Sequence, residues 1–238
     1  MKKIKFFTIC LLSIVAMAVN AQTTKGWDGV RVSYNSFTLD GGVSYSPTQS
    51  LYQEGSEDYF QDWDAVMGLE IGYIKSFSIS KGLPLFLETG ASLLWVNGDL
   101  REYNEDFSDE YENDIIEEKT SVNMFSLIVP VNVGYKFDIN EDFSVFPYAG
   151  AYFRANITGK LKDELNDHLE TQDNYSNEID MFDKDEGDGD RLQVGLQIGA
   201  TLNYKETYNL GISYGFDINE VMKKVDSSKF AVTLGYNF

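Results

Sequence analysis

Cysteine and histidine are almost absent from this chain of 238 residues. The single cysteine is Cys10, near the N-terminus, and the single histidine is His168. Because Cys10 falls within a predicted signal peptide, disulfides, zinc–thiolate sites and cysteine nucleophiles are excluded from the rest of the chain. A histidine base would have to be His168, and nothing in the sequence orients a nucleophile beside it. We therefore predict no catalytic residue, no metal ligand and no cofactor.

Basic residues are also scarce, with 19 Lys and Arg against 38 Asp and Glu. Three of them, Lys2, Lys3 and Lys5, precede an apolar run over 6–19 and the sequence "VNAQ". This is the pattern of a secretory signal cleaved after Ala21, which predicts a signal peptide over 1–21 and one domain over 22–238. The domain would have sixteen basic and 38 acidic residues, a net charge of −22, which disfavours nucleic acid as a partner.

Long apolar runs are missing after residue 21, so no transmembrane helix is predicted. The chain has instead an apolar–polar alternation with a period of two, the pattern of β-strands with one apolar face. "RLQVGLQIGATLNY" (191–204), for example, alternates Leu, Val, Ile and Tyr with Gln, Gly, Thr and Asn. Eight such strands are predicted, over 29–35, 67–79, 85–95, 125–137, 143–157, 191–204, 208–216 and 229–238.

The connections between these strands differ sharply in length. Three are tight turns, at 80–84, 139–142 and 205–207, and the long ones cover 36–62, 98–120, 158–190 and 217–228. Short turns at one end and long loops at the other are typical of an up-and-down transmembrane barrel. We predict an all-β, eight-stranded antiparallel barrel in the outer membrane, with periplasmic termini and acidic extracellular loops. An extra hairpin at "DGGVSYS" (40–46) would instead give ten strands.

The polar face of the strands distinguishes a membrane barrel from a soluble ligand carrier. Four segments, 125–135, 192–204, 208–216 and 230–238, contain no charged residue. A soluble barrel needs charge on its outer surface, whereas Gly, Ser, Asn, Gln and Thr suit the narrow interior of an eight-stranded membrane barrel. The apolar face is therefore predicted to face lipid.

A few charged residues stand within the strands at positions that the alternation directs into the lumen: Arg31, Glu70, Glu88, Lys136 and Arg154. An unpaired charge inside a membrane protein is costly, so we predict that these residues form structural ion pairs. Arg31 and Glu88 would form one layer near the short turns, and Glu70 and Arg154 a second layer above it. Ion selection in a pore is the alternative, which the small lumen disfavours.

Two of the long connections are strongly acidic. Residues 98–120 have ten acidic and two basic residues, and residues 158–190 have twelve and three. Such blocks are typical of hydrated surface, although "DKDEGDGDR" (183–191) leaves weak calcium binding open. The segment 183–191 departs from the EF-hand pattern, since Gly187 occupies a ligand position.

The connection over 36–62 contains several aromatic residues. Their rings either bind a partner or pack over the mouth of the barrel.

The order and spacing of five segments resemble the PorT-like outer-membrane β-barrel family, which is common in Bacteroidota. The segments are "LIVPVNVGYKF", "YAGAYFRANITG", "DRLQVGLQIGA", "LGISYGFDIN" and "VTLGYNF". Pro130 matches a proline of the family's fourth strand, whereas Ala151 after Gly150 departs from its Gly-Pro pair. The resemblance implies an eight-stranded outer-membrane barrel without catalytic residues, and a role in protein secretion for some members.

The chain ends on "KFAVTLGYNF", with Tyr236 and Phe238 as its last aromatic residues. This ending is similar to the C-terminal signal that the outer-membrane assembly machinery recognises, and the strand is expected to close the barrel. We expect an integral outer-membrane protein, not an enzyme, with a structural, interaction or narrow-pore role. Its expected partners are membrane lipid, the assembly machinery, and an extracellular ligand or a secretion-system component. An accessory role in secretion and a membrane-embedded hydrolase are the alternatives.

Overall fold

The computed structural model describes residues 26–40, 64–106, 115–167, 175–222 and 225–238. The strands of this part of the chain belong to one antiparallel sheet. Their bounds are β1 Asp28–Asp40, β2 Val66–Ser78, β3 Leu85–Asp106, β4 Ile115–Tyr135, β5 Phe137–Asp138, β6 Phe143–Asp167, β7 Tyr175–Asp180, β8 Leu192–Tyr204, β9 Tyr208–Asp217 and β10 Asp226–Asn237. No helix among the described residues is long and apolar enough to cross a membrane.

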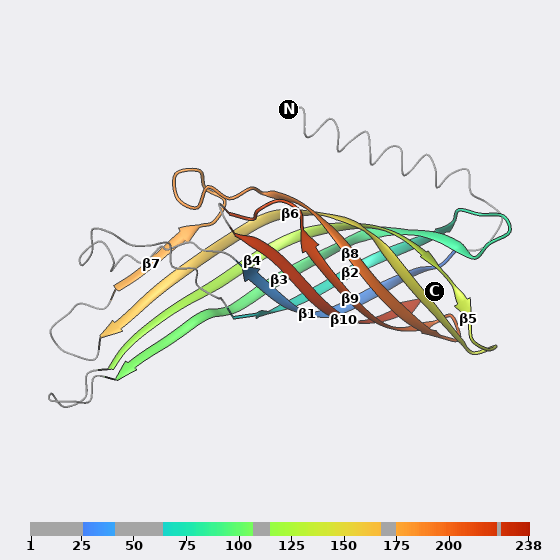
Figure 1. Cartoon of the computed structure of the whole chain (residues 1–238), viewed down its shortest axis with the longest axis horizontal. Helices are drawn as coiled ribbons and strands as arrows, with labels where there is room; N and C mark the ends of the chain where they lie inside the picture. Colours follow the sequence, from blue (N-terminus) through green and yellow to red (C-terminus); the bar gives the residue numbers. More distant parts are fainter. Residues whose placement is uncertain (1–25, 41–63, 107–114, 168–174, 223–224) are drawn as a thin grey trace.

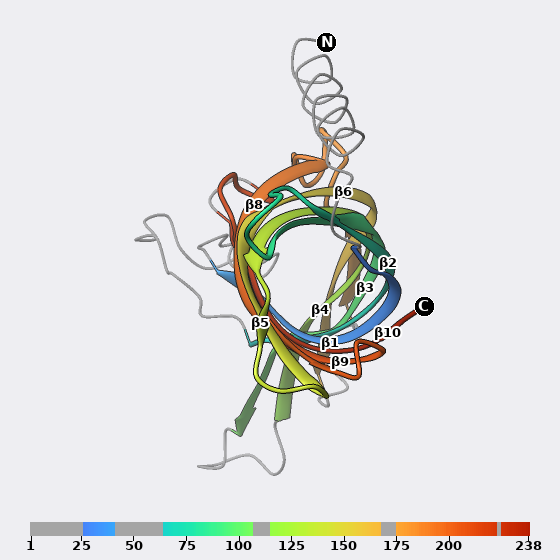
Figure 2. The ribbon, with the colours of Figure 1, turned by 90° about the vertical axis from the view of Figure 1, so that its right-hand side faces the viewer.

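Eight of these strands close into a barrel. They pair in the order β4-β3-β2-β1-β10-β9-β8-β6, and β4 also pairs with β6. The first and last strands are joined along their length, from Gly29 opposite Asn237 to Asp40 opposite Asp226. Viewed end-on, the ribbon forms a ring around a single axis (Figure 2). The predicted closed, eight-stranded antiparallel barrel is therefore confirmed.

The two other strands add to β6 outside this ring. β5 pairs with the beginning of β6 and β7 with its far end. There β3, β4 and β6 continue past the ends of the remaining barrel strands and project to the left in Figure 1. We call the four-stranded projection formed by residues 98–106, 115–122, 158–167 and 175–180 the outer sheet.

The outer sheet corrects the sequence-based strand boundaries. The alternation predicts long loops over 98–120 and 158–190, but most of these residues lie in strands. β3 continues to Asp106, β4 begins at Ile115 and β6 continues to Asp167. The prediction was wrong there because it relied on an apolar lipid-facing stripe. A strand that projects into water needs no such stripe, since pairing with its neighbours satisfies its backbone.

The apolar face of the barrel points outward. Leu234 and Ile198 are 63% and 62% exposed, whereas the polar side chains of Asn132, Gln197 and Asn203 are buried inside. An apolar belt around a closed ring of backbone hydrogen bonds suits a hydrocarbon environment. The short turns and the C-terminus lie at the end of the barrel opposite the outer sheet (Figure 1).

Several predicted features fall outside the described residues. They are the signal peptide over 1–21, all of the predicted hairpin at 40–46 except Asp40, the aromatic residues over 45–63 and His168. These stay predictions.

Candidate functional site

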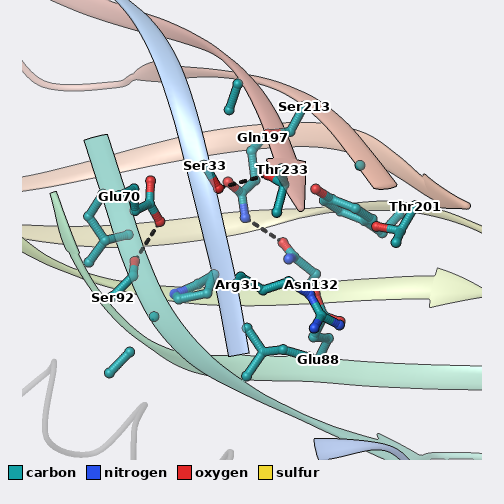
Figure 3. Close-up of a pocket in the computed structure, with 18 of the residues that line it drawn as sticks. Arg31, Ser33, Glu70, Glu88, Ser92, Asn132, Gln197, Thr201, Ser213 and Thr233 are labelled. Atoms are coloured by element: carbon teal, nitrogen blue, oxygen red, sulfur yellow. Dashed lines mark hydrogen bonds between the residues drawn. The ribbon is translucent and has the colours of Figure 1, made fainter. Parts of the chain in front are cut away.

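The middle of the lumen is a polar layer contributed by strands from all sides of the barrel. It surrounds a cavity of about 80 Å³, whose lining includes Arg31, Ser33, Glu70, Glu88, Ser92, Asn132, Tyr148, Gln197, Thr201, Ser213, Lys229 and Thr233. Hydrogen bonds join side chains of nearby strands within this layer. Ser33 of β1 is bound to Thr233 of the adjacent β10 at 2.8 Å, and Gln197 Nε2 of β8 donates to Asn132 Oδ1 of β4 at 2.7 Å (Figure 3). Ligand pockets commonly enclose 300–1,000 Å³, so this cavity suits a few water molecules.

Glu70 is held in this layer by two neighbours. Lys229 Nζ of β10 donates to Glu70 Oε2 at 3.0 Å, and Ser92 Oγ of β3 donates to Oε1 at 2.5 Å. The Lys229 ammonium also lies 5.4 Å from the ring centroid of Tyr152. Both carboxylate oxygens are therefore satisfied, and the charge of Lys229 is neutralised inside the lumen.

A second buried ion pair lies nearer the outer sheet. Arg154 Nη2 bonds to Asp217 Oδ2, and the side chains of the two residues are 1% and 0% exposed. Tyr152 donates its hydroxyl proton to Asp217 Oδ1 at 2.7 Å, and Ser227 bonds to both charged partners. The Arg154 guanidinium lies 5.1 Å from the ring centroid of Phe37. This network ties the ends of β9 and β10 to β6 across the lumen.

The predicted pairing of Glu70 with Arg154 needs correction, and Lys136 forms its ion pairs at the mouth of the barrel and not within the lumenal layer. The sequence places Glu70 and Arg154 in one layer as partners, but Glu70 binds Lys229 and Arg154 binds Asp217. Lys136 follows the end of β4 at the mouth of the barrel, where it pairs with Glu206 and lies 3.6 Å from Asp138.

Arg31 and Glu88 line the same cavity, as the alternation predicts. Arg31 donates to Asn237 Oδ1 and to the carbonyl of Val30, both at 2.9 Å. Glu88 accepts a hydrogen bond of 3.4 Å from Trp27 Nε1.

Sequence reasoning missed Lys229 and Asp217, although the signal for both is present. In β9 the inward positions are Asn209, Gly211, Ser213 and Gly215, and the same alternation continues to Asp217. In β10 the inward positions Thr233 and Ala231 lead back to Lys229. Lys229 is the first residue of the predicted strand 229–238, and Asp217 directly follows the predicted strand 208–216. Applying the alternation to the first residue of one strand, and extending the other strand by one residue, would have found the two missing partners.

Above the polar layer the lumen becomes apolar. Inward side chains of β1, β2, β3, β4 and β6 pack in one cluster with residues from the connections after β7 and β9. The members are Phe37, Leu39, Val66, Leu94, Val96, Leu100, Val122, Met124, Ile128, Tyr152, Leu161, Met181, Phe182, Val221, Met222 and Val225. All of them are buried, so this cluster, which we call the apolar plug, packs the loop-side end of the barrel like a protein core.

Aromatic side chains narrow the opposite, short-turn end. Trp27, just before β1, lies 4.8 Å from Phe86 and 5.1 Å from Phe146 between ring centroids. Its backbone N–H donates to Ser76 Oγ at 2.7 Å. Below it, a cavity of about 440 Å³ opens between the short turns and is lined by Lys136, Lys205 and Phe238, among others. The lumen is thus narrowed by side chains at both ends.

The outer sheet has ion pairs on its surface. Lys160 Nζ binds Glu178 Oε1 at 2.5 Å, and this hydrogen bond raises the pKa of Lys160. Lys119 binds Asp99 at 2.9 Å, and Lys162 binds Glu164 at 2.5 Å. Burial raises the pKa of the Asp163 carboxyl. These pairs neutralise part of an excess of acidic side chains.

The carboxylates of "DKDEGDGDR" stabilise a compact turn. Asp183 Oδ1 accepts from the N–H of Asp185 at 2.8 Å, and Glu186 Oε2 accepts from the N–H of Asp180 at 2.7 Å. Asp188 has a φ of 47°, in the left-handed region. The part of the chain that the structure describes brings no three His, Cys, Asp or Glu side chains together as a metal site.

A family model described as the outer membrane protein beta-barrel domain matches residues 7–238. No curated protein matches the chain at a significant level. Among solved structures, Ail of Yersinia pestis is 14% identical, with a TM-score of 0.40, and Neisserial surface protein A is 12% identical, with a TM-score of 0.42. Each match covers 90% of this chain and 100% of the other. The narrower PorT-like assignment stays a prediction.

Proposed function

Since the chain belongs to the outer membrane protein beta-barrel domain family, we propose that it is a non-conducting membrane anchor that presents an acidic interaction surface outside the cell. The barrel would serve to hold the outer sheet in place. The apolar plug is the observation that carries this proposal, because it fills with buried hydrophobic side chains the path that a pore would need.

The lumenal network supports a structural role for the barrel interior. Glu70, Lys229, Arg154 and Asp217 are all engaged in ion pairs within the lumen. A conducting pore needs a continuous water-filled path from one end of the lumen to the other. Paired and buried charges instead hold together strands that are not direct neighbours in the sheet.

The orientation that this function requires places the short turns in the periplasm and the outer sheet outside. Tight turns on the periplasmic side and longer extracellular segments are the rule in outer-membrane barrels. The described parts of the acidic segments 98–120 and 158–190 lie at the end opposite the short turns, so this orientation directs their acidic residues outward.

Cysteine labelling tests the orientation. The only native cysteine is Cys10, in the predicted signal, so single substitutions give a clean readout. Lys184→Cys and Lys205→Cys both place a thiol at an exposed position. Lys184 lies in the connection that follows β7, and Lys205 lies in the short turn between β8 and β9 at the other end of the barrel (Figure 1). We expect a membrane-impermeant maleimide to label Lys184→Cys on intact cells, and Lys205→Cys only after the outer membrane is permeabilised. Labelling in the reverse pattern would overturn the proposed orientation.

Planar-bilayer recording tests closure of the lumen. The purified wild-type protein is expected to give no resolvable single-channel steps, because the apolar plug excludes hydrated ions. A general porin measured in the same bilayers serves as the positive control. Reproducible ohmic steps from the wild-type protein, at a frequency that rises with its concentration, would show that the lumen conducts and that an anchor role is wrong.

A further inference from the structure

The strand β7 is at an edge of the outer sheet. It pairs with β6, from Tyr175 opposite Leu165 to Asp180 opposite Lys160, and no strand among the described residues pairs with its other side. In Figure 1 it projects beside β6, away from the closed ring. An edge strand presents backbone N–H and C=O groups on which an additional strand can pair.

The hydrogen bonds at the end of β7 identify which backbone groups face the open side. Met181 N donates to the carbonyl of Gly159 at 2.9 Å, which continues the pairing with β6. Because backbone groups alternate along a strand, the N–H groups of Ile179 and Asn177 also point toward β6. Those of Ser176 and Glu178 point away from it.

Asp180 confirms this alternation. Its N–H is also on the side away from β6, and it donates to Glu186 Oε2 at 2.7 Å. The Glu186 side chain therefore closes one end of the edge. Ser176 and Glu178 are exposed residues, and their outward N–H and C=O groups form the open part of the β7 edge.

The surroundings of this edge are acidic. Residues 175–190 contain seven acidic residues and one basic residue, a net charge of −6. Asp183, Asp185 and Asp188 are all exposed in the turn that follows β7. Charge complementarity favours a partner with basic side chains, and it also disfavours pairing of the edge with another acidic copy of itself.

We propose that the open edge of β7 binds an extended, Lys- and Arg-rich segment of an external protein by strand addition. The backbone groups of Ser176 and Glu178 pair with the added strand, and the neighbouring acidic turn attracts its cations. The inference rests on the proposed outward orientation of the outer sheet, which the cysteine labelling tests independently.

Binding of a synthetic peptide to the full-length protein in lipid nanodiscs tests the inference directly. The probe is a decapeptide of alternating Lys and Thr, whose composition favours an extended strand. Ser176→Pro removes an outward N–H at an edge position that tolerates proline, and Ser176→Ala is the matched control that keeps it. We expect Ser176→Pro to bind the probe about 5–10-fold more weakly than Ser176→Ala, which should match the wild type.

A second probe keeps the test valid if Ser176→Pro fails to fold. The same decapeptide with alternate backbone nitrogens methylated has the same charge but cannot complete a ladder of hydrogen bonds. It is expected to bind the wild-type protein at least about 5-fold more weakly than the unmethylated peptide.

The variant Asp188→Asn tests the contribution of the acidic turn. Asparagine also accepts the left-handed φ of this position, so the backbone can be retained. The variant should bind the unmethylated peptide more weakly than the wild type does, and its affinity should depend less on salt concentration.

Equal affinity of the two peptides for the wild-type protein would show that charge alone is recognised and would overturn strand addition. Absence of binding to the wild type would overturn the proposal as well, since the edge would then be unavailable. Neither result depends on which way the barrel faces, so each is separate from a failure of the proposed function.

Discussion

Replacing Arg154 by methionine is expected to lower the free energy of unfolding by about 3–5 kcal/mol. The substitution keeps most of the side-chain volume but leaves the fully buried Asp217 carboxylate without its cation. An uncompensated buried charge costs more than the pair itself contributes, which makes single substitutions severe. Urea titration of tryptophan fluorescence in lipid vesicles, together with the heat-dependent shift of the barrel on gels, measures the effect.

The double variant Arg154→Met/Asp217→Leu separates the ion pair from simple loss of packing. Removing both charges should cost less than the sum of the two single substitutions, with a coupling energy of about 1–3 kcal/mol. Lys160→Met is the matched control, because Lys160 and Glu178 form an exposed pair, and it should leave the unfolding curve nearly unchanged. Additive effects of the two single substitutions would contradict the proposed network.

Gly195→Val is expected to destabilise the barrel by about 2–4 kcal/mol through overpacking and a broken hydrogen bond. A Cβ atom at Gly195 would lie 2.1 Å from Cζ of Tyr152, so the ring would have to move. Tyr152 is fully buried, and its hydroxyl donates to Asp217. The backbone cannot retreat, because Gly195 is paired with β6 on one side and β9 on the other.

Two variants serve as controls for this clash. Gly82→Val introduces the same side chain into a short turn, where an added Cβ has no atom within 4 Å, and should have little effect. Gly195→Val combined with Tyr152→Ala should be about as stable as Tyr152→Ala alone, because the obstructing ring is gone. If Gly195→Val had the same free energy of unfolding as the wild-type protein, Tyr152 would not occupy this part of the lumen.

The membrane-spanning part of the fold was predictable because a single physical constraint acts on every residue in it. Lipid on one side and a narrow polar lumen on the other impose a period of two, as in the strand "RLQVGLQIGATLNY". The eight barrel strands and the inward direction of Arg31, Glu70, Glu88 and Arg154 follow from that alternation. The outer sheet did not follow from it, because strands in water are free of the lipid constraint.

The candidate site was less predictable than the fold. Alternation tells which face a side chain occupies, but the partner of a lumenal charge depends on the stagger between strands. Lys229 and Glu70 are 159 positions apart in the chain, and they meet because β10 and β2 both flank β1. No local pattern contains that information.

The sequence by itself therefore determined that the chain forms a closed membrane barrel and which face of its strands contacts lipid. It also determined that the long connections, at the end opposite the short turns, are acidic. The tertiary structure alone decided that Glu70 pairs with Lys229 and Arg154 with Asp217, and that sixteen apolar side chains gather at the loop-side end of the lumen. It also decided that β7 leaves an open edge among the described residues. The physical reason is that alternation is a local property of each strand, whereas pairing across the lumen and packing of the plug depend on how all the strands are staggered around the ring.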